Sequence, residues 1–191
     1  MTRLRSVGAL LVGSAAAASV AAGTRPARAD PQASLGLTLG GAVEQAVGPE
    51  PATGSFHMGA RADVLFLRSR PGQMALGPYA DVATDGFHDV DVGGGAEWLL
   101  PITDDLPLVL GAGALARNGE GRSWTPGGEA TVFFGSRSYN FESWYGLAAG
   151  AFAQARWFPT SPAVLDVVFG VQIDAELLAL PFLFAYEAVA H

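Results

Sequence analysis

Alternation between large apolar and small or polar side chains runs through most of this chain and constrains its fold more than any other feature. The stretch from Leu165 to Asp174 reads LDVVFGVQID, in which every odd position is large and apolar. A period of two places successive side chains on opposite faces of a strand. The pattern recurs from Leu35 to Val43 and from Phe56 to Val64. We therefore expect a chain built from strands with two unlike faces.

The alternation predicts eight strands. They cover residues 33–45, 55–67, 74–84, 89–100, 106–117, 128–139, 144–157 and 163–175. Segments rich in glycine, proline, asparagine and aspartate separate them, which is typical of turns. Examples are Arg70-Pro71-Gly72, Asp85-Gly86, Asn118-Gly119, Pro126-Gly127-Gly128 and Tyr139-Asn140. The length suits one domain.

The first residues are typical of a secretory signal. Two arginines precede an apolar run from Val7 to Ala22, and Ala27-Arg28-Ala29 supplies small residues at the A-x-A positions. We expect residues 1–29 to be removed and residues 30–191 to form a single domain. Because this removal takes four arginines, it shifts the formal net charge from -7 to -11. A chain this acidic is not expected to bind nucleic acid, which requires a basic surface.

One face of the predicted strands carries ionised side chains of both signs. These are Arg61, Asp63, Asp81, Asp89, Asp91, Glu97, Arg117, Glu129, Arg137, Arg156, Asp166 and Asp174. Carboxylates and guanidinium groups confined together form hydrogen-bonded ion pairs, so we predict that these residues form a polar network inside a barrel. The chain contains no cysteine, which excludes disulfide and thiolate chemistry.

The opposite face consists of leucine, valine, phenylalanine, alanine and isoleucine, and it suits contact with lipid. Phe66, Trp98, Tyr145 and Trp157 lie near predicted strand ends, where the aromatic girdles of membrane barrels meet the interface. In hydrocarbon every backbone polar group needs an internal partner, so strands that cross a membrane must close into a barrel.

In this pattern the chain resembles the small eight-stranded outer-membrane β-barrel proteins over nearly all of residues 33–175. The resemblance implies an all-β, antiparallel, up-and-down transmembrane barrel in the cell outer membrane with both termini in the periplasm. It also implies that outer-membrane lipid and the outer-membrane assembly machinery are its partners. We expect a monomer and no cofactor.

Two features depart from that family. Its members usually end on an aromatic residue, whereas this chain ends Ala190-His191. The turn from Pro159 to Pro162 falls on the predicted outer side, although it reads like a tight periplasmic turn. A strand missed or counted in excess between residues 117 and 157 would explain the second departure.

Residues 177–191 form a predicted C-terminal extension. Its uncharged part is too short to cross a bilayer as a helix, and Pro181 does not suit the middle of a strand. Three alternatives stay open. We prefer a short apolar helix along the interface. The segment could instead fold back against the barrel end, or continue the last strand to Phe184 or Tyr186.

Eight strands enclose an interior just wide enough for side chains or for one small ligand. We therefore favour a non-porin barrel with a structural, envelope-stabilising or adhesive role. The alternatives are a barrel that binds or transports a small apolar ligand and, less favoured, a lipid-modifying enzyme. The predicted inward glycines either let the strands bend around the luminal charges, which we prefer, or leave room for a ligand. They are Gly59, Gly77, Gly93, Gly95, Gly111, Gly113, Gly146, Gly150 and Gly170.

We assign no catalytic, cofactor-binding or metal-binding residue from the sequence. The segment His88-Asp89-Val90-Asp91 offers metal ligands, but it lacks a second imidazole nearby, so an arginine-paired loop edge is favoured. Ser55 and His57 share a strand face, as a nucleophile and a base would. They need a third, orienting group, and Asp63 is the nearest candidate on that strand.

Overall fold

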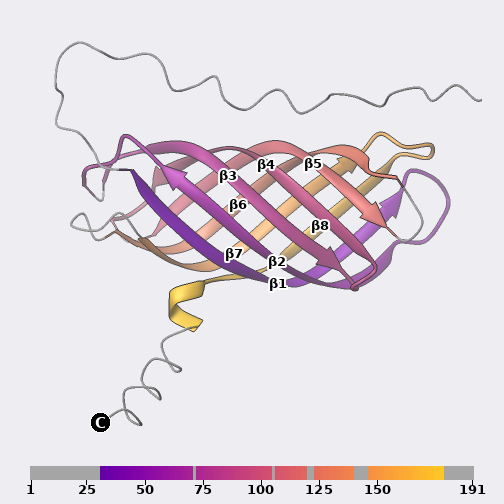
Figure 1. Cartoon of the computed structure of the whole chain (residues 1–191), viewed down its shortest axis with the longest axis horizontal. Coiled ribbons are helices and arrows are strands. Elements are labelled where there is room, and N and C mark those ends of the chain that lie inside the picture. Colours follow the sequence, from indigo (N-terminus) through magenta and orange to yellow (C-terminus); the bar gives the residue numbers. More distant parts are fainter. Residues whose placement is uncertain (1–30, 71, 105, 120–122, 140–145, 179–191) are drawn as a thin grey trace, which may run out of the picture.

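The computed structural model describes residues 31–70, 72–104, 106–119, 123–139 and 146–178, which form a closed barrel of eight strands (Figure 1). The strands are β1 (Gln32–Ala46), β2 (Thr53–Leu65), β3 (Ala75–Asp85), β4 (Asp89–Pro101), β5 (Pro107–Gly119), β6 (Thr125–Tyr139), β7 (Gly146–Phe158) and β8 (Val164–Asp174). Each strand runs antiparallel to the next, and β8 closes the barrel against β1. The predicted all-β, up-and-down fold is confirmed.

Strand boundaries differ from the predicted ones by a few residues. The largest difference is in β6, which begins at Thr125. The predicted turn Pro126-Gly127-Gly128 is therefore wrong, because these residues continue β6, with Pro126 opposite Ala116 of β5. Residues 107–158 contain β5, β6 and β7 as predicted, with neither an added nor a missing strand among the described residues. The short turn over residues 159–163 thus lies at the end opposite the termini of the barrel.

The two ends of the barrel differ in the strand termini and the connections that they contain. The terminus end holds Gln32, Asp174 and the connections β2–β3, β4–β5 and β6–β7, whereas the opposite end holds the other four connections. At the opposite end, β3 and β4 meet in a tight turn, in which the amide of His88 donates to the carbonyl of Asp85 at 3.3 Å. The φ angles of Gly86 (61°) and Phe87 (63°) are both positive, as the hairpin turn that matches strand twist requires. The predicted Asp85-Gly86 turn is confirmed.

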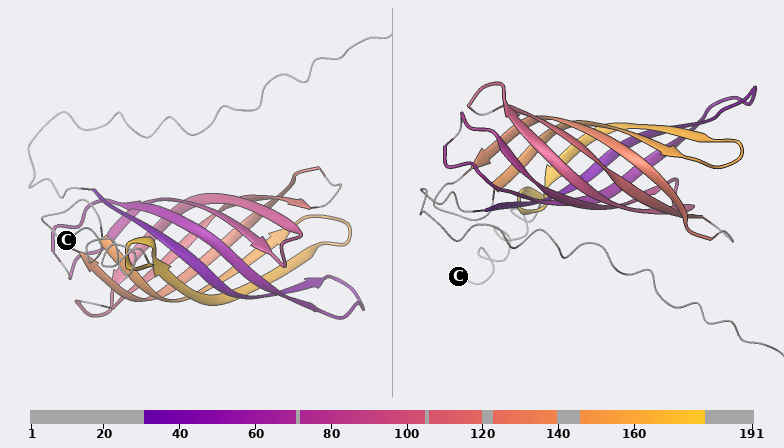
Figure 2. Two further views of the ribbon diagram at one scale, coloured as in Figure 1. Left: turned by 60° about the horizontal axis from the view of Figure 1, so that its bottom comes forward. Right: turned by 90° about the horizontal axis from the view of Figure 1, so that it is seen from above.

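A helical turn over residues 175–178 follows β8 at the terminus end (Figure 2). The carboxylate of Asp174 caps it, since its Oδ1 accepts from the amide of Glu176 at 2.9 Å. The rest of the predicted C-terminal extension and all of the predicted signal segment lie outside the described residues. Within the part of the chain that the structure describes, no helix has the length and apolar character needed to cross a membrane.

Three pairs of glycines lie directly opposite each other on neighbouring strands. They are Gly40 and Gly170, Gly95 and Gly113, and Gly135 and Gly150. A Cβ atom added at any of them would overlap a backbone atom of the facing strand, as at Gly40 with the carbonyl oxygen of Phe169. Glycine therefore permits the close approach by which strongly bent strands pair.

The outer face of the strands is apolar and open. Its large side chains are a third or more exposed, and they include Leu35, Leu37, Leu39, Phe56, Met58, Val82, Val92, Leu110, Val132, Phe134, Val167, Phe169 and Val171. The inner face holds most of the buried polar and charged side chains. This is the inverse of a soluble barrel, in which large apolar side chains fill the core and charges lie outside.

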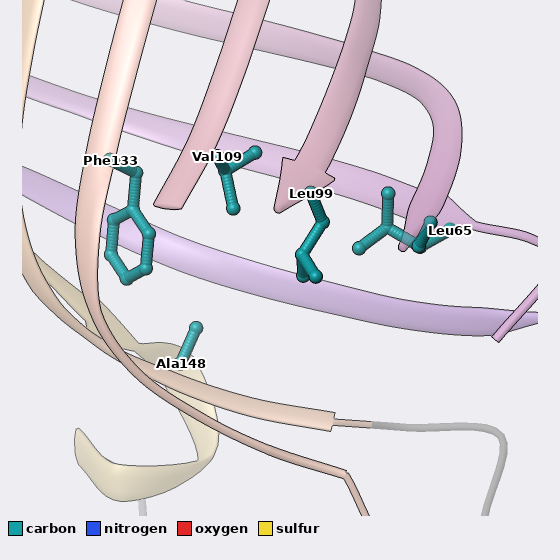
Figure 3. Packing of buried hydrophobic residues seen from close by; sticks show 6 residues of the cluster. Leu65, Leu99, Val109, Phe133 and Ala148 are labelled. Atoms are coloured by element: carbon teal, nitrogen blue, oxygen red, sulfur yellow. The ribbon is translucent and has the colours of Figure 1, made fainter. Parts of the chain in front are cut away.

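Apolar side chains also fill the terminus end of the lumen. Leu65, Ala75, Leu99, Val109, Phe133 and Ala148 form one buried cluster, which we call the apolar plug (Figure 3). The alternation in the sequence predicts large apolar residues on the outer face alone. The plug could not be predicted from the alternation, because both faces are apolar near these strand ends, as in Leu108-Val109-Leu110.

Candidate functional site

The candidate site is the polar interior of the barrel. All twelve residues predicted for the luminal network lie on the inward faces of their strands, and nine of them form the ion pairs described below. Of the other three, Asp174 accepts hydrogen bonds from the backbone amides of Ala148 and Glu176. Glu129 accepts from Tyr79 and Gln154, and Asp89 lines the cavity at the mouth of the lumen.

The part of the network nearest the apolar plug is centred on Arg137. Its guanidinium donates to the hydroxyl of Ser34 at 2.7 Å, contacts the carboxylate of Asp63, and reaches Glu97 at 3.4 Å. Ser34 in turn donates to Asp63 at 2.8 Å. These four residues come from β6, β1, β2 and β4, so this cluster ties together strands that are far apart around the barrel.

The middle of the lumen is centred on Arg61. Its guanidinium lies 2.9 Å from Glu97 and 3.6 Å from Asp81, and it stacks over the ring of Tyr79 at 3.7 Å from the centroid. The hydroxyl of Tyr79 donates to Glu129 at 2.7 Å. Glu97 therefore joins this cluster to that of Arg137.

The part nearest the opposite end contains Arg117 and Arg156. Arg117 binds Asp91 through two nitrogens, at 2.8 and 2.9 Å, and also contacts Asp166 at 2.5 Å. Arg156 donates to Asp91 at 2.7 Å and to Asp85 at 2.8 Å. Bidentate pairs of this kind hold both partners in a fixed orientation, so the luminal mouth is rigidly cross-linked.

His57 belongs to the network, although the sequence pattern suggested only Ser55 as its partner. Its Nδ1 lies 2.7 Å from Asp85 and its Nε2 lies 3.2 Å from the hydroxyl of Thr38. Both ring nitrogens are therefore engaged, while Ser55 is exposed at the strand end. The partners of His57 are thus Thr38 and Asp85, rather than the Ser55 and Asp63 that were weighed from the sequence. The register explains this, because His57 lies directly opposite Asp85.

The order Asp85, His57, Thr38 is that of an acid, a base and a hydroxyl nucleophile. However, His57 is 1% exposed and Thr38 is 7% exposed. The cavity beside them has a volume of about 30 Å³, which is enough for one or two water molecules. A substrate larger than water does not fit there, so the geometry favours a structural role for these three residues.

The acidic residues of the candidate metal segment around His88 belong to the luminal network and its mouth. Asp91 is bound by two arginines, and Asp89 lies at the mouth of the lumen. Among the residues that the structure describes, no group of three or more histidine and acidic side chains is arranged to hold a metal ion.

A wider cavity opens at the mouth of the lumen, at the opposite end. It has a volume of about 370 Å³, and its lining includes Glu44, Asp89, Arg117, Phe158 and Thr160. The guanidinium of Arg117 stacks over the ring of Phe158 at 4.3 Å and binds Glu44 at 3.1 Å. The network therefore forms the floor of this vestibule and separates it from the apolar plug.

The network contains further residues beyond the twelve predicted ones. Glu44, Asp85, Tyr79 and Gln154 all lie on inward faces. Their positions in the alternation could have identified them, since Tyr79, Asp81 and Asp85 share one parity on β3. Asp85 had been assigned to a turn and Tyr79 had not been considered as a luminal donor.

The resemblance to outer-membrane barrels rests on the alternation and on the faces of the strands. Searches with protein-family models, among curated proteins and among solved structures found no match for this chain.

Proposed function

We propose that the protein is a small non-porin β-barrel of the cell outer membrane with a structural, envelope-stabilising role. The observation that carries this proposal is the inverted distribution of side chains, with an exposed apolar outer face and a buried charged interior. Lipid is the solvent that makes such an outer face favourable, because the same surface in water would leave a continuous apolar area exposed. In this proposal both termini lie on the periplasmic side.

Aromatic side chains at both ends of the outer face support the membrane location. Phe66 and Trp98 lie exposed near the terminus end, and Phe56, Phe87 and Trp157 lie exposed near the opposite end. Aromatic residues at these two levels are typical of membrane interfaces. Tyr145, which was also predicted for a girdle, lies outside the described residues.

The filled lumen supports a role other than transport. The apolar plug occupies the terminus end, and the ion pairs cross-link the rest. The central cavity of about 30 Å³ is lined by charged groups such as Arg61 and Asp81, which does not suit an apolar ligand. The described connections at the opposite end are short, which favours a structural role over an adhesive one.

The membrane location predicts where the protein is found in the cell. We expect it to sediment with the outer-membrane fraction and to require detergent for extraction. On electrophoresis in dodecyl sulfate, the unheated sample should migrate differently from the boiled one, because a closed barrel resists unfolding by the detergent. Recovery of the folded protein from the periplasm without detergent would contradict the proposal.

Introducing a charge in the middle of the outer face should show whether lipid or water surrounds the barrel, because the two solvents predict different losses of stability. We expect Leu39→Arg to lower the free energy of unfolding in lipid vesicles by about 2–4 kcal/mol, the range for arginine at the bilayer midplane. The control is Val47→Arg at the strand end, where the change should be about 0–1 kcal/mol. Denaturant titration followed by tryptophan fluorescence measures both. Equal effects at the two sites would argue for a barrel surrounded by water.

A further inference from the structure

An apolar groove lies on the outer side of the barrel at the terminus end, beside the connection between β2 and β3. It has a volume of about 350 Å³ and is lined by Leu67, Met74, Ala75, Leu76 and Trp98. We call it the rim groove. Four of these five side chains are large and between 45% and 72% exposed. A groove of this size and character can hold a section of an acyl chain.

Hydrogen bonds fix the backbone of the β2–β3 connection, which borders the rim groove. Phe66 and Leu76 exchange two backbone hydrogen bonds, at 3.0 and 3.3 Å, which fix the start of the connection. Its turn is held by Gln73, whose side-chain oxygen accepts from the amide and from the hydroxyl of Ser69, both at 2.9 Å. The shape of the groove is therefore defined before any ligand arrives.

The backbone of Leu67 is strained in the conformation that directs it to this groove. Its φ is 71°, in the left-handed region that favours glycine. Its side chain is the most exposed of those in the groove, at 72%. A strained residue with an exposed apolar side chain is one for which a binding role is worth testing.

One exposed arginine, Arg70, lies in the connection that borders the groove. The chain has no lysine, and of the arginines that the structure describes, Arg70 alone is exposed. Its carbonyl accepts from the amide of Gln73 at 3.2 Å, which places its backbone next to the residue preceding Met74. An exposed arginine whose backbone lies at the edge of an apolar groove, at a membrane rim, matches an acyl chain that carries a phosphate.

We propose that the rim groove and Arg70 together bind one anionic phospholipid of the periplasmic leaflet. The groove takes part of an acyl chain, and Arg70 pairs with the phosphate headgroup. This inference rests on the proposed function, because it requires the terminus end to lie at the periplasmic interface. The placement of the exposed arginine at this rim of an otherwise acidic protein favours a lipid over the C-terminal segment or a second copy of the chain.

The test is native mass spectrometry of the full-length protein in a lipid-free detergent, titrated with dioleoyl phosphatidylglycerol or dioleoyl phosphatidylcholine. We expect phosphatidylglycerol to bind about fivefold more tightly, the effect of one arginine near a charged surface. Arg70→Gln should abolish this preference, and Arg70→Lys should keep most of it. Met74→Gln should weaken both lipids, whereas Ile102→Gln, at a similarly exposed position of the same rim, should leave both unchanged.

Several results would overturn the lipid site. One is an unchanged preference in Arg70→Gln, and another is an equal effect of Met74→Gln and Ile102→Gln. Tighter binding of both lipids by a chain that ends at Leu178 would assign the groove to the C-terminal segment. A dimer lost only in Met74→Gln would assign it to a second copy. Since fractionation and heat modification are measured on the same protein, a membrane barrel without the lipid preference refutes the lipid site alone.

Discussion

Replacing Arg137 with methionine is expected to lower the free energy of unfolding by about 3–5 kcal/mol, the range for removing one partner of a buried ion pair. Arg137 is 4% exposed and contacts Asp63 and Glu97, which are 4% and 2% exposed. Without the guanidinium, both carboxylates stay buried with fewer donors. The loss comes mainly from these stranded charges rather than from the removed contacts. Urea titration of the barrel in detergent micelles measures it.

A second variant separates the stranded charge from the lost packing. Asp63→Leu added to Arg137→Met removes one of the two carboxylates, so the double variant should be more stable than Arg137→Met alone. Arg70→Met serves as the matched control, since exposed Arg70 should change the stability by about 0.5 kcal/mol or less. A loss below about 1 kcal/mol in Arg137→Met would show that the lumen hydrates its charges freely and is not sealed.

Alanine at Gly40 is expected to destabilise the barrel by about 3 kcal/mol or more, at the upper end of the range for overpacking. The added Cβ would overlap the carbonyl oxygen of Phe169, which belongs to the backbone and cannot turn aside. The neighbouring Gly41 provides the control, because its added Cβ would lie 3.6 Å from the ring of Phe169, in ordinary contact. Gly41→Ala should be neutral or stabilise by up to about 1 kcal/mol.

The two alanine variants are compared by thermal unfolding and by heat-modified migration. Gly40 and Gly41 are adjacent on β1, so the two variants share the strand, the position along the barrel and the chemical change. They differ only in the face of the strand on which the methyl group is added. Similar stabilities for both variants would contradict the requirement for close approach at the paired glycines. The same reasoning applies to the other two pairs, Gly95 with Gly113 and Gly135 with Gly150.

The strands were predictable because their alternation is long and regular. Segments such as LDVVFGVQID in β8 fix both the strand and the face of each residue, since a shift by one residue would exchange the two faces. The start of β6 was missed because Pro126-Gly127-Gly128 has turn chemistry. Its proline lies at the end of the strand, where a missing backbone donor is tolerated.

The partners within the lumen could not be derived in the same way. Alternation shows that Arg137 and Asp63 both point inward, but they lie on strands that are not neighbours in the barrel. Their contact depends on the width of the lumen and on the register of every strand between them. The pairing of His57 with Asp85 is different, because these residues are opposite each other on adjacent strands. Its prediction required only the register of one hairpin.

The pairing of β8 with β1 has a consequence for the order in which the protein is made. Synthesis produces β8 last of the eight strands, so β1 lacks its second neighbour until the seven preceding strands have been made. Before then, any sheet that has formed has two open edges, each able to pair with another chain. Contacts between strands so distant in sequence also form slowly. The interval between synthesis and closure is therefore when the nascent chain is most exposed to aggregation and has most need of a chaperone.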